Sequence, residues 1–231
     1  MEFEREKQSL LLEGVRYTAN DLHLLKTKAV GASDSSTGQM LYDFLQEWFT
    51  ESPWMTVHTS GSTGKPKKIR ISKDKMMQSA RLTCEFLNLQ IGDTALLCMN
   101  LRYIGAMMVV VRSLVAGLNL IIRPASGHPL ADMKQPLRFA AMVPLQVYNT
   151  LQVPEEKERL RQTDVLIIGG GAIDEALEAE IRNLPGAIYS TYGMTETLSH
   201  IALRRLNGVL ASERYYPCLL YTSPSPRDRT R

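Results

Sequence analysis

Residues 164–191 read DVLIIGGGAIDEALEAEIRNLPGAIYST, and the predicted architecture of the chain starts from them. An apolar run at 164–168 is followed by three glycines, by a segment with helical spacing at 174–184 and by a second apolar run at 187–191. A strand, a helix and a strand in this order form a parallel pair joined by a crossover helix. The stretch therefore predicts a parallel sheet with helices packed against it.

The same alternation continues toward the N-terminus. We expect strands at 94–99, 118–123 and 139–143, and helices at 104–116 and 144–151. Further upstream we expect a strand at 14–18, helices at 18–28 and 40–48 on either side of a Ser/Gly/Asp loop at 31–38, strands at 54–58 and 68–71, and a helix capped by Ser72. The predicted fold class is α/β, with mostly parallel sheets covered by helices.

Composition and charge exclude several classes of function. The chain has 231 residues, of which 44% are hydrophobic, and a formal net charge of +3. Its basic residues are scattered rather than gathered in a stripe, so we expect no nucleic-acid partner. The most apolar stretch, 104–122, is interrupted by Arg112, Gly117 and Asn119, so we expect no membrane insertion. Residues 1–7 are unlike a signal peptide, which favours a cytoplasmic protein.

Residues 218–231 differ from the rest of the chain. They read CLLYTSPSPRDRTR, show no helical or strand periodicity, and resemble the translation of a sequencing-library adapter. We therefore expect one domain at 1–217 and a non-native tail at 218–231. The alternative is a disordered Ser/Pro/Arg tail.

Between the strands expected at 54–58 and 68–71 lies a segment with the composition of an anion-binding loop. It reads Thr59-Ser60-Gly61-Ser62-Thr63-Gly64-Lys65-Pro66-Lys67. Glycines let the backbone approach an anion, hydroxyls and backbone N–H groups donate to phosphate oxygens, and lysine adds charge. The order differs from a Walker A loop, because Pro66 follows Lys65 and Thr59 stands at the first glycine position. The alternative is a polar surface loop.

The glycines that follow the strand at 164–168 form a second candidate binding feature. Ligands of open α/β sheets bind outside the carboxyl ends of the strands, where glycines leave a flat slot for a ring or a sugar. The run does not complete a G-x-G-x-x-G motif, because Asp174 stands at its third glycine position. The alternative is a tight turn from strand to helix. The residues of this slot are Gly169, Gly170, Gly171 and Ala172.

The strand at 187–191 leads into a polar segment with a third set of candidate residues. Tyr192 offers an aromatic face to a purine, Gly193 allows close backbone approach, and Thr195 offers a hydroxyl to a phosphate. Glu196 can bind Mg²⁺, which proteins hold through one or two carboxylates and substrate phosphates. The alternative is a helix N-terminus with Thr195 as its cap and Glu196 complementing the helix dipole.

Together the three segments resemble the acyl-adenylate-forming superfamily, the AMP-dependent synthetases and ligases, from about residue 54 to residue 204. The resemblance implies the large N-terminal domain of such an enzyme. It also implies ATP, Mg²⁺ and coenzyme A as cofactors and a small carboxylic acid as substrate. The expected activity is that of an AMP-forming acid–CoA ligase.

The resemblance further implies a role for each segment. Residues 59–67 would wrap the β- and γ-phosphates of ATP, and residues 169–172 would line the adenine and acyl pocket. Tyr192, Gly193, Met194 and Thr195 would bind the nucleotide, with Tyr192 stacked on adenine and Thr195 at the α-phosphate. Lys65, Thr195 and Glu196 are the implied catalytic residues, and Glu196 is the implied Mg²⁺ ligand.

Within the superfamily, segments 100–105, 126–130 and 194–200 look most like those of the o-succinylbenzoate–CoA ligases of menaquinone biosynthesis. That acid has two carboxylates, of which one is activated and the other is recognised. Arg102, Tyr103 and His200 are the candidate substrate residues, since an arginine can bind a carboxylate through two hydrogen bonds. Surface or helix-capping roles are the alternative for Arg102 and His200. Asn100 and Tyr103 depart from the Pro and His that relatives often have there.

The resemblance also implies a ribose-binding aspartate, a hinge and a small C-terminal domain with the adenylation lysine, for which this sequence shows no counterpart. We therefore expect a truncated N-terminal part of a longer enzyme, with almost no adenylation activity by itself. Two other functions stay open. One is an adenylation domain that loads a carrier protein, and the other is a non-catalytic nucleotide-binding module, against which Glu196 argues.

Overall fold

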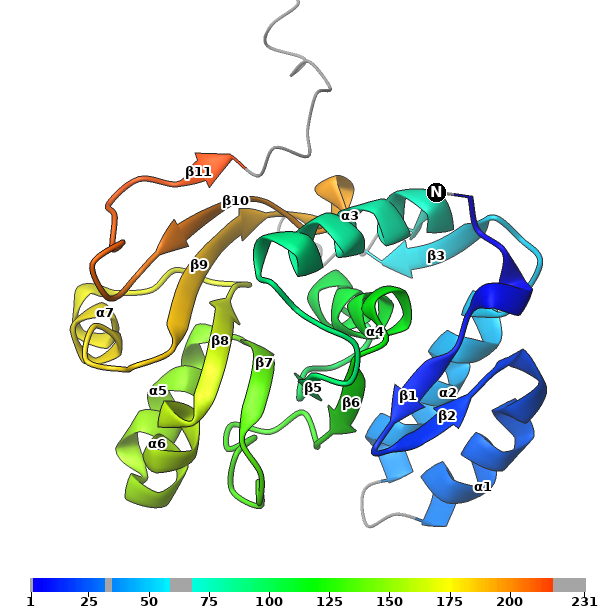
Figure 1. Ribbon diagram of the computed structural model, residues 1–231, viewed down its shortest axis with the longest axis horizontal. Coiled ribbons are helices and arrows are strands. Elements are labelled where there is room, and N and C mark those ends of the chain that lie inside the picture. Colours follow the sequence, from blue (N-terminus) through cyan, green and yellow to red (C-terminus); the bar gives the residue numbers. More distant parts are fainter. Residues whose placement is uncertain (1, 32–34, 59–67, 218–231) are drawn as a thin grey trace, which may run out of the picture.

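The computed structural model describes residues 2–31, 35–58 and 68–217, and a nine-stranded sheet lies at their centre (Figure 1). Its strand order is β11-β10-β9-β8-β7-β5-β6-β1-β2. Five neighbouring pairs are parallel and three are antiparallel, which confirms the predicted α/β class with a mostly parallel sheet. The strands that carry the parallel core are β5 (Thr94–Leu97), β6 (Asn119–Ile122), β7 (Leu137–Met142), β8 (Thr163–Ile168) and β9 (Ala187–Gly193).

Helices cover both faces of the sheet. Along β8, Val165 and Ile167 belong to one buried cluster, whereas Leu166 and Ile168 belong to the other. Successive side chains of a strand point to opposite faces, so each strand supplies both cores. The first cluster includes residues of α3 (Lys73–Phe86) and α4 (Ile104–Ala116), and the second includes residues of α5 (Pro144–Gln152), α6 (Pro154–Arg161) and α7 (Glu175–Ile181).

The N-terminal segment joins the sheet at β6. Strand β1 (Leu10–Leu12) pairs in parallel with β6 and antiparallel with β2 (Val15–Tyr17), where the sequence predicted a strand. The capping role expected of Thr18 is confirmed, because its side chain accepts a hydrogen bond from Asn20 N in η2 (Ala19–Asp21). A short turn, η1 (Arg5–Lys7), precedes β1.

The loop expected at 31–38 is wrong at residue 31 and at residues 35–38, which are helical, while residues 32–34 lie outside the described residues. Helix α1 (Leu22–Gly31) includes Gly31, and α2 (Ser35–Trp48) begins at Ser35. Serine and threonine are favoured where helices start, so a Ser/Thr-rich run is compatible with a helix N-terminus as well as with a loop.

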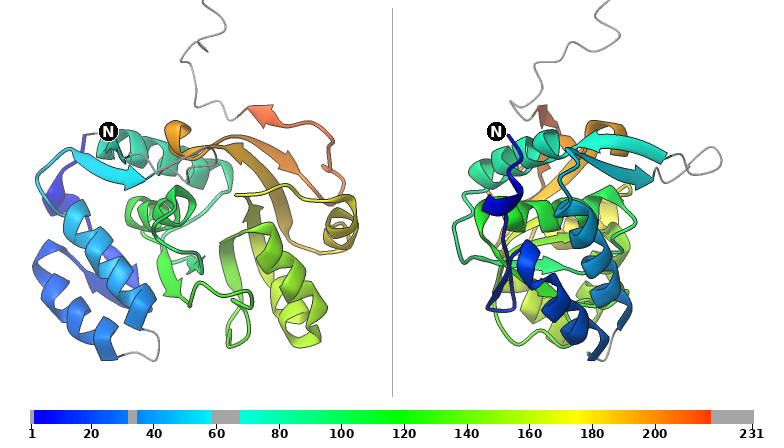
Figure 2. Two further views of the ribbon diagram at one scale, coloured as in Figure 1. Left: turned by 180° about the vertical axis from the view of Figure 1, so that it is seen from behind. Right: turned by 90° about the vertical axis from the view of Figure 1, so that its right-hand side faces the viewer.

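A separate two-stranded hairpin precedes α3. It consists of β3 (Trp54–His58) and β4 (Lys68–Ser72), with His58 opposite Lys68, and Figure 2 shows it extending away from the sheet in its right-hand view. Both strands were predicted. Ser72 caps α3 as expected, because its Oγ accepts a hydrogen bond from Lys75 N at 3.4 Å.

The part of the chain after β9 contains elements that the sequence patterns did not predict. The turn η3 (Thr195–Thr197) leads into β10 (His200–Arg205), which pairs antiparallel with β9 and with β11 (Tyr216–Pro217).

Helix α6 was also not predicted, because PEEKERLR carries a single apolar residue and so shows no helical period. The tail expected to be non-native, 218–231, lies outside the described residues.

Candidate functional site

The candidate residues come from segments that meet at one edge of the sheet. Strands β5, β7, β8 and β9 are joined by parallel pairing, so their carboxyl ends lie along the same edge. Ligands of open α/β sheets bind at this edge. Here β5 leads toward Arg102 and Tyr103, β8 leads into Gly169, and β9 ends at Tyr192 and Gly193.

The glycine segment makes a close turn beside β9. Gly169 N donates to Met142 O at 3.1 Å, and a Cβ at Gly169 would overlap the Thr191 side-chain oxygen. Gly170 has φ +80°, in the left-handed region that favours glycine. Gly170 therefore needs glycine for its backbone conformation, as the tight-turn alternative states, whereas a Cβ at Gly169 would displace the Thr191 side chain. Gly171 and Ala172 are exposed and leave the same edge uncovered.

Helix α7 follows this turn. Asp174 is its N-cap, and its carboxylate accepts a hydrogen bond from Leu177 N at 2.8 Å. The residue that breaks the dinucleotide-binding pattern thus has a local structural role.

At the end of β9, an aromatic ring and a glycine stand next to each other. The Tyr192 side chain is 55% exposed, and its ring packs edge-to-face against Tyr215 with centroids 6.1 Å apart. A Cβ at Gly193 would overlap Ser199 O and lie 2.6 Å from His200 Cα. Gly193 is therefore required for the close approach of β9 and β10.

The segment from Met194 to Leu198 forms a compact turn rather than the start of an α-helix. Met194 N donates to Thr197 Oγ1 at 3.0 Å, and Leu198 adopts φ +70° with its side chain buried. Because η3 is one short turn followed by a strand, the alternative in which Thr195 caps a helix has no helix to cap. Glu196 is exposed and forms no ion pair with another residue of the described part of the chain, which leaves its carboxylate open to a cation.

The candidate substrate residues divide into two groups. Arg102 and Tyr103 are exposed on the loop between β5 and α4, where Arg102 N donates to Asn100 Oδ1 at 2.9 Å and Tyr103 is the N-cap residue of α4. His200 is only 8% exposed, and its Nε2 lies 3.4 Å from Thr83 Oγ1 of α3. The structure brings Arg102 and Tyr103 to the open edge and places the imidazole of His200 in the interior.

A buried charge next to His200 was not singled out from the sequence. Arg112 of α4 is 1% exposed, and its Nη2 donates to Ser199 Oγ at 2.8 Å. Burial, with a smaller contribution from the Arg112 charge, lowers the pKa of His200 to about 3, so the imidazole is neutral near pH 7. The sequence signal was a single arginine within an otherwise apolar helix.

The expected phosphate loop, 59–67, lies outside the described residues, but the base of its hairpin is described. Lys73, which follows β4, is fully buried, and its Nζ donates to Trp48 O at 2.7 Å and Thr50 O at 2.8 Å. The ammonium also lies 4.3 Å from the centre of the Phe3 ring. Burial lowers the pKa of Lys73 to about 8. These contacts anchor the hairpin to the end of α2.

Within 2–31, 35–58 and 68–217, no three or more His, Cys, Asp or Glu side chains are grouped as they would be to hold a metal ion. None of the helices in these ranges has the length and apolarity needed to span a membrane.

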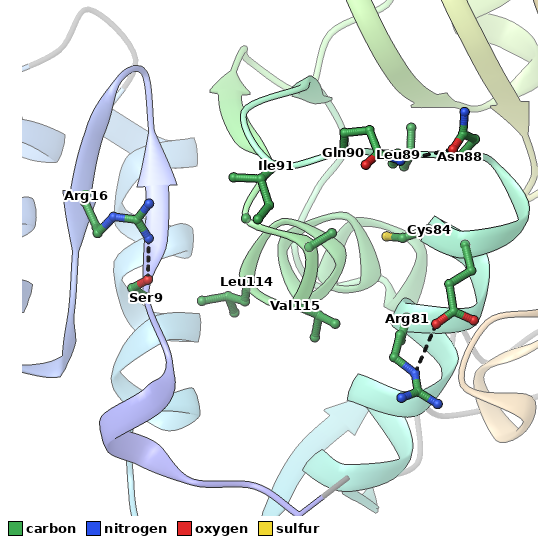
Figure 3. A pocket seen from close by; sticks show the side chains of 13 residues that line it. Ser9, Arg16, Arg81, Cys84, Asn88, Leu89, Gln90, Ile91, Leu114 and Val115 are labelled. Atoms are coloured by element: carbon green, nitrogen blue, oxygen red, sulfur yellow. Dashed lines mark hydrogen bonds and ion pairs between the residues drawn. The ribbon is translucent and has the colours of Figure 1, made fainter.

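A cavity of about 600 Å³ lies at the opposite end of α4 from Tyr103 (Figure 3). Its lining includes Leu114, Ile91, Arg16, whose guanidinium donates to Ser9 Oγ at 2.8 Å, and Arg81. None of the candidate site residues within the described ranges lines it.

The chain belongs to the AMP-binding enzyme family, because the model of that family matches residues 13–218. Among curated relatives, 2-succinylbenzoate–CoA ligase of Bacillus mycoides is 27% identical over 162 residues, which are 68% of this chain and 34% of the relative. The ligase of the same name from Bacillus cytotoxicus is 27% identical over 187 residues, 76% of this chain and 38% of the relative. The chain thus spans about a third of the length of these relatives.

Solved structures show the same fold. An acyl-CoA synthetase (AMP-forming)/AMP-acid ligase II-like protein from Dyadobacter fermentans superposes with a TM-score of 0.75 and 34% identity, over 83% of this chain and 56% of that one. O-succinylbenzoate coenzyme A synthetase from Bacillus subtilis, solved with ATP and magnesium ion, gives a TM-score of 0.56 and 23% identity, over 65% of this chain and 32% of that one.

Proposed function

We propose that this protein activates a carboxylic acid with ATP as an acyl-AMP and then transfers the acyl group to coenzyme A. Family membership and the names of the relatives support this proposal. The observation on which it chiefly rests is the edge formed by the glycine turn and the η3 turn. There the exposed ring of Tyr192 lies near the end of β9, the exposed carboxylate of Glu196 lies four residues later on η3, and the glycine turn follows the neighbouring parallel strand β8.

The proposed reaction has two steps. A carboxylate oxygen of the acid attacks the α-phosphorus of ATP, and pyrophosphate leaves with the electron pair of the broken P–O bond. The thiolate of coenzyme A then attacks the acyl carbonyl carbon, and AMP leaves. The first step brings two anions together, so the protein must supply fixed positive charge and N–H donors.

The described residues would supply the contacts to adenine, the acyl group and the α-phosphate, while the positive charge is assigned to Mg²⁺ and to Lys65. Tyr192 would stack on adenine, residues 169–172 would line the adenine and acyl pocket, and the Thr195 hydroxyl would donate to the α-phosphate. The Glu196 carboxylate is a hard oxygen ligand of the type that Mg²⁺ prefers. When bound, Mg²⁺ would neutralise phosphate charge. Lys65 and the rest of 59–67, outside the described residues, remain the proposed grip on the β- and γ-phosphates.

For the acid we propose o-succinylbenzoate, which would place the protein in menaquinone biosynthesis and in the cytoplasm. The support is the name shared by the curated relatives and the position of Arg102. Arg102 and Tyr103 are exposed at the carboxyl edge, where a second carboxylate of the substrate can reach them. The neutral, buried His200 fits a supporting role behind the pocket better than direct charge pairing with the acid.

The test is pyrophosphate release by the full-length enzyme with a panel of acids, in the presence and absence of coenzyme A. We expect o-succinylbenzoate to give the highest kcat/KM, and thioester to form only when coenzyme A is present. A preference for acids with one carboxylate would contradict the assignment of the substrate. Transfer to a carrier protein instead of coenzyme A would favour the carrier-loading alternative, and absence of pyrophosphate release with every acid would favour a non-catalytic module.

The role of Arg102 has a more specific test. Arg102→Met removes the guanidinium, so we expect KM for the dicarboxylic acid to rise about tenfold or more while KM for ATP stays unchanged. The matched control is Arg161→Met on α6, where the arginine is 44% exposed and away from the carboxyl edge. Equal changes in KM for the acid and for ATP would remove Arg102 from the acid site.

A further inference from the structure

Tyr215 lies beside the proposed adenine-stacking residue, although it comes from a distant part of the sequence. It precedes β11, and its ring packs edge-to-face against Tyr192, with an interplanar angle of 61°. Its hydroxyl lies 2.6 Å from Ser190 Oγ, and Ser190 is buried within β9. Two contacts, to Ser190 and to Tyr192, therefore join Tyr215 to the end of β9.

A partly buried ion pair lies beside Tyr215. The Arg204 guanidinium lies 5.7 Å from the centre of the Tyr215 ring. The same guanidinium donates to Glu178 through two hydrogen bonds, at 2.6 Å to Oε2 and 3.1 Å to Oε1. The side chains of Arg204 and Glu178 are only 14% and 16% exposed. Two parallel bonds to one carboxylate hold a guanidinium in a defined orientation.

This ion pair connects the two turns of the proposed site. Glu178 belongs to α7, which follows the glycine turn, and Arg204 belongs to β10, which follows the η3 turn. Figure 1 shows α7 beside the β9–β11 edge of the sheet. The hydrogen bonds from Arg204 lower the pKa of Glu178, and those from Glu178 raise the pKa of Arg204, as expected for a charged pair at neutral pH.

An exposed tyrosine at the end of a strand can rotate about its side-chain bonds, and a base that stacks on it must restrict that rotation. A neighbouring ring that restricts it beforehand reduces the entropy lost on binding. Aromatic pairs favour the edge-to-face arrangement seen here, and a second tyrosine is well suited to this task.

We propose that Tyr215 is a positioning residue that orients the Tyr192 ring for the purine base, and that the Glu178–Arg204 pair holds Tyr215 in place. The proposal rests on the proposed function for the identity of the ligand. The contact between the two rings does not depend on a ligand, so it can be tested separately.

The first experiment measures the Tyr192 ring in this chain without nucleotide. The nine tyrosines are labelled with ¹³C, and the Tyr192 signal is assigned by its loss in Tyr192→Phe. We expect Tyr215→Ala to shift the Tyr192 ring signals and to increase their mobility in relaxation measurements. Tyr215→Phe keeps the ring and loses the hydroxyl contacts to Ser190 and Arg204, so it should retain most of the wild-type behaviour. Glu178→Gln should shift the signals in the same direction as Tyr215→Ala.

Tyr216→Ala is the matched control. Tyr216 is the next residue in the chain, is 61% exposed, and has its hydroxyl near Ser212 rather than near Tyr192. Wild-type Tyr192 signals in Tyr215→Ala would overturn the proposal. So would an equal change in Tyr216→Ala, because the effect would then not be specific to Tyr215.

The second experiment titrates the same variants with AMP. We expect Tyr215→Ala to bind AMP about 3- to 10-fold more weakly than the wild type, as for the loss of one aromatic pair. Tyr215→Phe and Tyr216→Ala should bind within about twofold of the wild type. A wild-type chain that does not bind AMP would contradict adenine binding by Tyr192 in this chain, and the ring measurement would still decide whether Tyr215 orients Tyr192.

Discussion

At the scale of single residues, several positions of the site are explained by backbone conformation, close strand packing or helix capping without any ligand. Gly169 and Gly193 stand where a Cβ would overlap a neighbouring strand, and Gly170 takes a left-handed conformation. Asp174 caps α7. These residues shape the edge, whereas the exposed Tyr192 ring and Glu196 carboxylate have no comparable backbone role there.

Gly193 gives a direct test of this distinction. In Gly193→Ala the new methyl group meets backbone atoms of Ser199 and His200, so β9 and β10 must separate, and we expect the free energy of unfolding to fall by more than about 2 kcal/mol. The control is Gly105→Ala in α4, where a Cβ meets nothing within 4 Å. There alanine should raise stability by up to about 1 kcal/mol. Urea unfolding measures both, and a tolerated Gly193→Ala would contradict the close approach of the two strands.

The proposed role of Glu196 as a Mg²⁺ ligand can be tested by removing the charge of its side chain. Glu196→Gln keeps the shape of an exposed side chain and removes its charge, so stability should stay unchanged. If Glu196 binds Mg²⁺, kcat of adenylation in the full-length enzyme should fall about 100-fold or more, with a higher Mg²⁺ requirement. Glu155→Gln, at an exposed position of α6, serves as control. An unchanged Mg²⁺ dependence would exclude Glu196 as the ligand.

At the scale of elements, side chains of helices α3 and α4 form hydrogen bonds with Ser199 and His200, where β10 begins after the η3 turn. Arg112 donates to Ser199, and His200 lies against Thr83, so one hydrogen-bonded row joins the two helices to the start of β10. The Ser199 hydroxyl is 3.3 Å from His200 Nδ1. This row sets where β9 and β10 turn, and hence where Thr195 and Glu196 stand.

The same row makes stability depend on pH. The pKa of His200 in the folded chain is about 3, below its ordinary value of 6.5. Between these values the unfolded chain binds a proton that the folded chain excludes, so the free energy of unfolding should fall as pH decreases from 6.5 toward 3. The His200 contribution is fully present above pH 6.5.

Urea unfolding at pH 7, 6, 5 and 4 would measure this dependence. In His200→Gln we expect the free energy of unfolding to fall less steeply as pH decreases, by up to about 1 kcal/mol per pH unit. This difference in slope does not depend on how stable the variant is at pH 7. His23→Gln, at an exposed position of α1, should retain the wild-type slope. Parallel curves for wild type and His200→Gln would show that the imidazole is not held neutral.

At the scale of the whole molecule, one sheet separates two cores, and each core has its own helices. Ile167 and Ile168 are adjacent in the sequence, yet Ile167 packs with the α3 and α4 cluster and Ile168 with the α5, α6 and α7 cluster. The shared sheet should couple the two layers, so that they unfold together.

Ile167→Val and Ile168→Val test this coupling with the same chemical change on opposite faces. Each removes one buried methylene group, and we expect each to lower the free energy of unfolding by about 0.5–1.5 kcal/mol. Both variants should shift a single urea transition, observed by circular dichroism. Two resolved transitions, each moved by only one of the variants, would show that the layers unfold independently.

Most of the sheet and its helices could be predicted from apolar periodicity. Helix α4 was expected at its observed bounds as a mostly apolar run, of which residues 106–114 are all buried. The hairpin strands β3 and β4 were expected close to their bounds, because buried and exposed residues alternate along them. Helix α6 and strand β10 were missed, since α6 is mostly polar and β10 carries the charged Arg204 and Arg205 at its end. Their formation depends on packing and pairing partners that no local pattern encodes.

The sequence by itself determined most of the alternation of strands and helices, the glycine turn, the polar segment after β9 and, through their combination, the family. These features are local, because residue types and short spacings specify turns and periodic elements. The tertiary structure alone decided that His200 is buried and neutral, that Arg112 supports the η3 turn, and that Tyr215 lies against Tyr192. Burial and contacts between residues far apart in the chain depend on how the sheet folds, so composition and spacing cannot specify them.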